Sequence, residues 1–143
     1  MAAYCGLRTS AFSLPWRAVK VLELAQIEDN QSILEVAVGT GKLFAEIVKS
    51  NPQGHNEGID ISPEMLTKAK TRLTHSPSTN YDLKLGNVYQ LGTFDLIICN
   101  YLIDMLPEKD FIPILKSFNL RFRQACRNLT SDLGKTVHRK QAL

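Results

Sequence analysis

Cysteine, histidine and long apolar runs are scarce in this sequence, and each scarcity removes a class of protein. The three cysteines lie far apart and form no C-x-x-C pair, which favours neither a disulfide framework nor a zinc site. Such cysteine usage fits a reducing, cytoplasmic compartment. The three histidines lack ligand-like spacing, so we expect no metal site. No stretch of about 18 apolar residues occurs, so we expect neither a transmembrane helix nor a membrane partner.

The rest of the composition is ordinary for a globular protein. Hydrophobic residues make up 44% of the chain and charged residues 22%, and both fractions are close to the usual values. A chain of 143 residues is long enough to bury one core. These values predict one folded domain.

The first 22 residues contain basic side chains and no acidic one, a composition that is also found in organelle transit peptides. A helix that begins near Trp16 is the favoured alternative, because apolar residues recur at helical spacing after Pro15. The apolar stripe expected for this helix comprises Trp16, Val19, Leu22 and Leu24 or Ala25.

The most informative segment is a β-branched apolar run that ends in two glycines. It extends from Ile33 to Val38, and Gly39 and Gly41 precede a helical pattern that begins at Lys42. Glycines let the backbone adopt positive φ and approach a ligand closely, and the first turn of a helix presents free N–H groups. In open α/β sheets this arrangement holds nucleotide-like ligands beyond the carboxyl end of the first strand.

A second short strand ends at Asp60, about 20 residues further on, where the nucleotide-binding βαβ unit carries its ribose-binding carboxylate. Two other nucleotide motifs fit the glycine loop poorly. A P-loop requires a glycine where Val36 stands and a Ser or Thr where Leu43 stands. A dinucleotide fingerprint requires a third glycine where Phe44 or Lys42 stands.

The pattern that remains is acidic-x-Gly-x-Gly-x-Gly, read here as Glu35-x-Ala37-x-Gly39-x-Gly41. Together with Gly-Ile-Asp-Ile-Ser-Pro-Glu-Met-Leu at residues 58–66, it resembles the motifs of class I S-adenosylmethionine-dependent methyltransferases. The most similar branch is that of the small-molecule enzymes of the ubiquinone- and menaquinone-biosynthesis type. The resemblance spans residues 16–118. The alternative is that these are turn glycines and a turn aspartate in another α/β protein.

Strand and helix patterns alternate along this part of the chain. Ser62 and Pro63 are an N-cap and a first helical residue, and another helical pattern covers residues 42–50. Strands are expected at residues 33–38, 57–60, 81–85 and 94–99. Right-handed crossovers between parallel strands then give an α/β fold, a three-layer sandwich. As the resemblance implies, we expect a parallel Rossmann-like sheet in the order 3-2-1-4.

The resemblance implies S-adenosyl-L-methionine as the cofactor and assigns its methionine half to the glycine loop. Gly39 and Gly41 would lie against it. Glu35 would orient the loop and attract the ammonium group, and a tie between the loop and a neighbouring helix is its alternative role. Ala37 replaces the family's usual glycine, which is tolerable if its φ is negative. Asn100 would offer its backbone carbonyl to the ammonium group, or it caps the next helix.

The adenosine half is assigned to residues that follow the second and third strands. Asp60 can accept hydrogen bonds from both ribose hydroxyls, and Ile61 would pack on the adenine face. The Asn87 side chain would accept from the adenine amino group, and Val88 would donate its backbone N–H to the ring. The catalytic residues stay unassigned. Candidates for a general base, by position only, are Glu64, Tyr101 and Asp104.

The resemblance stops at Phe118, which divides the chain into an N-terminal part of a methyltransferase domain (1–118) and a basic tail (119–143). The tail carries six Lys or Arg residues and one acidic residue, and no strand-like apolar run is visible in it. A different reading frame, a splice alternative or a damaged gene would each explain the change. The charges predict a solvated, partly helical extension, and we expect no nucleic-acid partner.

The tail leaves the expected sheet without the last strands of the family's fold. The fourth strand, residues 94–99, would then be an edge that invites self-association.

The predicted function is a methyltransferase for a small molecule, impaired by truncation. The alternative is a non-catalytic remnant or isoform that binds the cofactor weakly or acts as an interaction module. Asn100-Tyr101 lacks both prolines of the amino-group DNA methyltransferase signature, which favours a small-molecule acceptor.

Overall fold

The computed structural model describes residues 14–87, 92–100, 102–119 and 129–130. Five parallel strands form one sheet in the order β3-β2-β1-β4-β5. Their bounds are β1 (Ser32–Val36), β2 (His55–Asp60), β3 (Tyr81–Leu85), β4 (Leu96–Cys99) and β5 (Leu129–Thr130). The predicted order 3-2-1-4 is confirmed. None of the described helices has the length and apolar character needed to span a bilayer.

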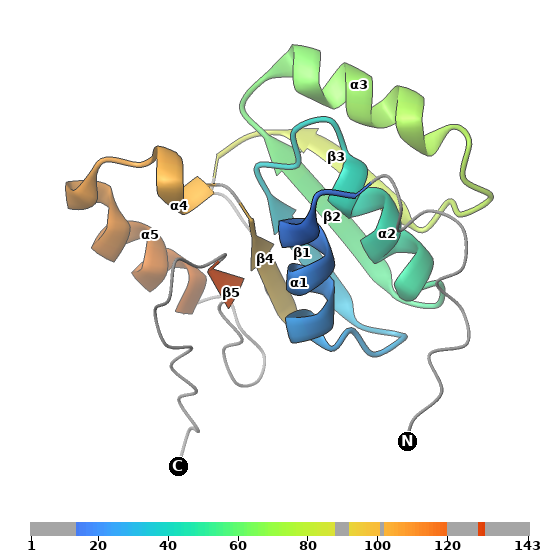
Figure 1. Cartoon of the computed structure of the whole chain (residues 1–143), viewed down its shortest axis with the longest axis horizontal. Coiled ribbons are helices and arrows are strands. Elements are labelled where there is room, and N and C mark those ends of the chain that lie inside the picture. Colours follow the sequence, from blue (N-terminus) through green and yellow to red (C-terminus); the bar gives the residue numbers. More distant parts are fainter. Residues whose placement is uncertain (1–13, 88–91, 101, 120–128, 131–143) are drawn as a thin grey trace.

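Helices pack on both faces of this sheet (Figure 1). They are α1 (Trp16–Ala25), α2 (Lys42–Ser50), α3 (Pro63–Leu73), α4 (Leu102–Met105) and α5 (Glu108–Asn119). Residues of α1, α2 and α3 share one buried cluster with Ile33, whereas α5 shares a second cluster with Leu34. Because successive strand residues point to opposite faces, the two clusters lie on opposite sides of β1. The predicted three-layer sandwich is confirmed.

Local sequence signals set the two helices nearest the glycine loop. α2 begins directly after Gly41, at the predicted residue Lys42. α3 begins at Pro63, and the hydroxyl of its N-cap Ser62 accepts a hydrogen bond from the Met65 N–H at 3.3 Å. This cap satisfies one of the N–H groups that a helix start leaves unpaired.

The face that α1 turns toward the sheet agrees with the prediction only in part. Ala18, Val21 and Ala25 are buried, whereas Trp16 is 68% exposed and Leu24 is 51% exposed. Ala25 is one of the two predicted alternatives, and the predicted Leu22 is partly buried against the same core cluster. Trp16 and Leu24 are the predicted side chains that point to solvent.

The prediction that residues 119–143 contribute no strand is wrong at residues 129–130. Leu129 and Thr130 pair in parallel with Ile98 and Cys99 at the carboxyl end of β4. A strand of two residues is too short to show a period-2 pattern, which explains why the sequence did not reveal it. Within the described residues Leu96 and Ile97 have no strand partner on that side, so β4 is covered only in part. The predicted self-association through β4 stays a prediction.

Candidate functional site

The loop that joins β1 to α2 has three residues in the left-handed backbone region. Their φ angles are 60° at Ala37, 57° at Gly39 and 75° at Gly41. The condition under which an alanine at position 37 would be tolerable, a negative φ, is therefore not met. This turn also ends β1 at Val36 rather than at Val38. A left-handed conformation costs a residue with a Cβ about 1–2 kcal/mol, so Ala37 is a strained position in the loop.

The two glycines of the loop serve different purposes. A Cβ added to Gly41 would lie 2.9 Å from the Ala69 Cβ, so the glycine is required for α3 to pack against the loop. A Cβ added to Gly39 would meet no atom within 4 Å. Packing therefore explains Gly41, while Gly39 faces open space where a ligand can approach the backbone.

Asp60 connects the glycine loop to the end of β2. Its Oδ2 accepts a hydrogen bond from the Gly39 N–H at 2.7 Å, and its Oδ1 accepts one from the Ser62 N–H at 2.9 Å. The residue is 9% exposed. An ionised carboxylate has about four lone-pair sites, so each oxygen retains capacity for a ligand hydroxyl. The structure thus places Asp60 and Gly39, two of the predicted site residues, in direct contact.

Glu35 is a buried carboxyl group at the same edge of the sheet. It is 2% exposed, and its Oε2 has no hydrogen-bond partner within the described part of the chain. Burial, and secondarily the negative charge of Asp60, raise the pKa of Glu35 well above its usual value. Burial and Glu35 together also raise the pKa of the Cys99 thiol. An unpaired polar atom of this kind is costly, and a cationic ligand would relieve it.

Exposed apolar side chains lie beside Asp60. Ile61, which follows it, is 80% exposed, and Leu85, its register partner on β3, is 62% exposed. The Gly86 N–H donates to the Asp60 carbonyl oxygen at 3.1 Å and holds the two strand ends together. Sequence reasoning missed Leu85, although its place at the last position of the predicted third strand was a signal that could have found it. This edge offers an apolar surface to a flat ring.

The other predicted site residues are the adenine-side residues, Asn100 and the candidate general bases. Asn87 is exposed just beyond β3, and Asn100 is 6% exposed directly after β4. Val88 and Tyr101 lie outside the described residues, as does the side chain of Asp104. Glu64 pairs with Lys68 at 2.6 Å, and that hydrogen bond lowers the pKa of Glu64, which makes it a poor proton acceptor. No group of three potential metal ligands occurs among the residues described.

The chain is similar to known methyltransferases in sequence and in fold. A family model described as a methyltransferase domain matches residues 27–137. The match continues beyond Phe118, so the predicted domain boundary there stays a prediction. A solved structure with the same fold is the magnesium protoporphyrin IX methyltransferase of Synechocystis PCC 6803 with bound SAM. Its TM-score is 0.70 at 15% identity, over 88% of this chain and 61% of that one.

Two curated relatives are similar in sequence. Malonyl-[acyl-carrier protein] O-methyltransferase of Anoxybacillus flavithermus is 34% identical over 95 residues, which cover 64% of this chain and 36% of the relative. Demethylmenaquinone methyltransferase of Lactococcus lactis is 29% identical over 106 residues, which cover 71% of this chain and 41% of the relative. The chain thus spans about two-fifths of the length of these relatives.

Proposed function

Because this chain belongs to the methyltransferase domain family, we propose that its glycine-loop site binds S-adenosyl-L-methionine for methyl transfer to a small-molecule acceptor. One observation carries the proposal. The Asp60 carboxylate, at the end of β2, accepts the Gly39 N–H of the loop that follows β1. A ribose held at Asp60 would therefore place the rest of the cofactor over the open side of Gly39.

The residues of the site suit the parts of this cofactor. Asp60 would accept hydrogen bonds from the ribose hydroxyls, and the exposed side chains of Ile61 and Leu85 would contact the adenine ring. Asn87 and Val88 would hold the polar edge of the ring, as the family resemblance implies. The two neighbouring strand ends thus supply both an acceptor and an apolar surface for an adenosine.

The methionine half would lie between the glycine loop and the end of β4. The unpartnered Oε2 of Glu35 would accept a hydrogen bond from the ammonium group, and the Asn100 carbonyl would accept another. When bound, the cofactor supplies a methyl group on a sulfonium sulfur for in-line displacement by the acceptor. The contribution of the chain would be mainly to hold the two reactants in line.

A second candidate function is cofactor binding without turnover. It is supported by one observation: the carboxylate of Glu64, one of the candidate general bases, forms a hydrogen bond with Lys68. A methyl-transfer assay with radiolabelled S-adenosyl-L-methionine separates the two candidates, because only the first gives labelled acceptor.

The binding part of the proposal is tested by Asp60→Ala. We expect S-adenosylhomocysteine affinity to fall more than tenfold in isothermal titration, because losing charge-assisted hydrogen bonds costs about 1.5–3 kcal/mol. Asp82→Ala is the matched control, since Asp82 is an exposed carboxylate on β3. Its affinity should equal that of the parent. Equal affinity of Asp60→Ala and the parent, at equal folded fraction, would contradict the proposal.

A further inference from the structure

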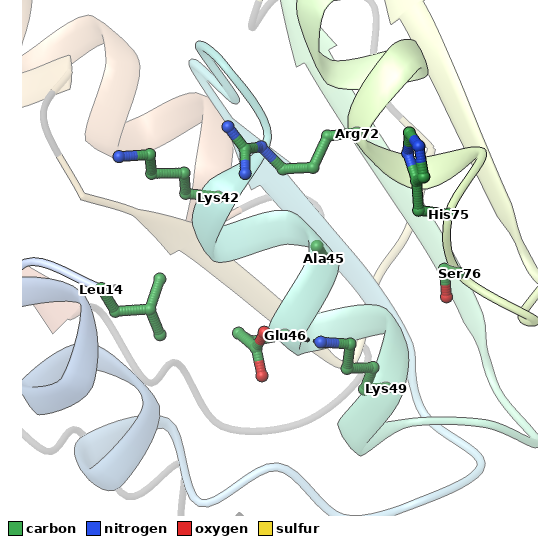
Figure 2. Close-up of a pocket in the computed structure, with 8 residues that line it drawn as sticks. All are labelled: Leu14, Lys42, Ala45, Glu46, Lys49, Arg72, His75 and Ser76. Atoms are coloured by element: carbon green, nitrogen blue, oxygen red, sulfur yellow. Dashed lines mark hydrogen bonds and ion pairs between the residues drawn. The ribbon is translucent and has the colours of Figure 1, made fainter. Parts of the chain in front are cut away.

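A hollow of about 170 Å³ lies over α2 and is bordered by the end of α3 (Figure 2). None of the residues assigned to the cofactor lines it. The side chains of Lys42 and Lys49 reach it from α2, and Arg72 and His75 reach it from the end of α3. It is therefore separate from the apolar surface at Ile61 and Leu85.

The charges around this hollow are unequal. Glu46 contributes its single carboxylate and accepts a hydrogen bond from the Lys49 ammonium at 2.8 Å. Among the described residues neither the Lys42 ammonium nor the Arg72 guanidinium makes an ion pair.

Arg72 is held in place by the glycine loop itself. Its Nε donates to the Thr40 carbonyl oxygen at 2.9 Å. Figure 2 shows the Arg72 guanidinium turned toward the first turn of α2, from which the Lys42 side chain extends away from Arg72. Because Nε is already bonded, the two terminal amino groups of the guanidinium remain for another acceptor. A planar pair of donors with fixed orientation is suited to the oxygens of a phosphate.

From this arrangement we propose that the hollow binds the phosphate group of a small molecule, with Arg72 and Lys42 as its principal ligands. Two positive charges match a phosphate dianion. The hollow, at about 170 Å³, is several times larger than the roughly 30 Å³ that a liquid water molecule occupies, so it has room for a phosphate group. This site goes beyond the proposed cofactor site and does not depend on it.

The test is a titration of the full chain with inorganic phosphate at constant ionic strength, followed by ¹⁵N NMR. We expect saturable shifts at Thr40, Lys42 and Arg72. Arg72→Gln and Lys42→Gln should each weaken binding at least tenfold. Lys70→Gln is the matched control, because Lys70 lies on α3 and does not line the hollow, and it should bind as the parent does.

Lys42→Gln keeps the test valid if Arg72→Gln disturbs the loop, since Lys42 has no described partner to lose. A parallel titration with methyl phosphate identifies the source. Binding of methyl phosphate as well as inorganic phosphate indicates an esterified ligand, and binding of inorganic phosphate alone indicates the free ion. The proposal is overturned if phosphate gives no saturable shift, or if Lys42→Gln binds as the parent does. It is also overturned if only a single-stranded oligonucleotide binds, with a steep salt dependence.

Discussion

Ala37 has a backbone conformation that is unfavourable for alanine. Its φ of 60° lies where glycine is favoured and where the family has glycine. Ala37→Gly should raise the free energy of unfolding by up to about 1 kcal/mol, because relief of about 1–2 kcal/mol of strain exceeds the added entropy of the unfolded chain. Chemical denaturation measures this. S-adenosylhomocysteine affinity should be unchanged or higher, and a loss of both stability and binding would show that the loop is arranged differently.

Glu35 should make the stability of the ligand-free chain depend on pH. Its pKa is raised in the folded state, so folding takes up a proton at any pH between the usual 4.5 and the raised value. The free energy of unfolding therefore falls as pH rises through that window, by at most about 1.4 kcal/mol per pH unit. Denaturant titrations at a series of pH values measure the slope.

The variant Glu35→Gln removes the titrating group and keeps its shape. It should flatten the slope above pH 4.5 and stabilise the ligand-free chain at neutral pH. Glu64→Gln is the control, because Glu64 is an exposed carboxylate on α3 and its loss should leave the slope above that pH unchanged. An identical slope in Glu35→Gln and the parent would rule out Glu35 as its source.

At the scale of elements, α3 and the glycine loop depend on each other. Gly41→Ala forces a Cβ against Ala69 and adds left-handed strain, so we expect a loss of about 2–4 kcal/mol in the free energy of unfolding. Gly39→Ala adds only the strain, about 1–2 kcal/mol. If Gly39 faces the cofactor, its variant loses more affinity per unit of lost stability than the Gly41 variant does. If instead the Gly41 variant loses more affinity per unit of lost stability, the ligand does not lie over Gly39.

The elements closest to the site were predictable because their signals are local. The bounds of α2 and β3 agree with the predicted 42–50 and 81–85, since a glycine pair, a helical period and turn residues mark them. The burial of Ala18 and Val21 and the exposure of Trp16 on α1 were not predicted from spacing, because they depend on how the helix is rotated against the sheet. Tertiary packing determines which face of a helix is buried, and this packing cannot be read from a single sequence.

Within the site too, the residues marked by local sequence motifs were predicted, whereas properties that depend on the three-dimensional structure were not. Asp60 and Gly39 were identified from motif spacing, and the structure brings them within hydrogen-bond distance. The sign of φ at Ala37 and the exposure of Leu85 depend on the three-dimensional turn and on the register of β2 with β3. Neither property can be predicted from composition or periodicity.

At the scale of the whole molecule, the described helices divide between the two faces of the sheet. α1, α2 and α3 contribute to the buried cluster on the first face, whereas α5 contributes to that on the second, with Leu102 of α4 packed against it. β5 adds two residues beside β4. The site at the ends of β1 and β2 lies within the part of the sheet that has strand partners on both sides, which is why binding is expected even if turnover is impaired.

The most direct test of this account is a titration of the full chain with S-adenosylhomocysteine followed by ¹⁵N NMR. We expect saturable binding with the largest amide shifts at Gly39, Ile61 and Asn100. The same titration of Asp60→Ala should show those shifts only at much higher ligand concentration. Absence of binding to the folded parent chain, or shifts confined to the hollow at Lys42 and Arg72, would contradict the central claim that the carboxyl edge of the sheet is the cofactor site.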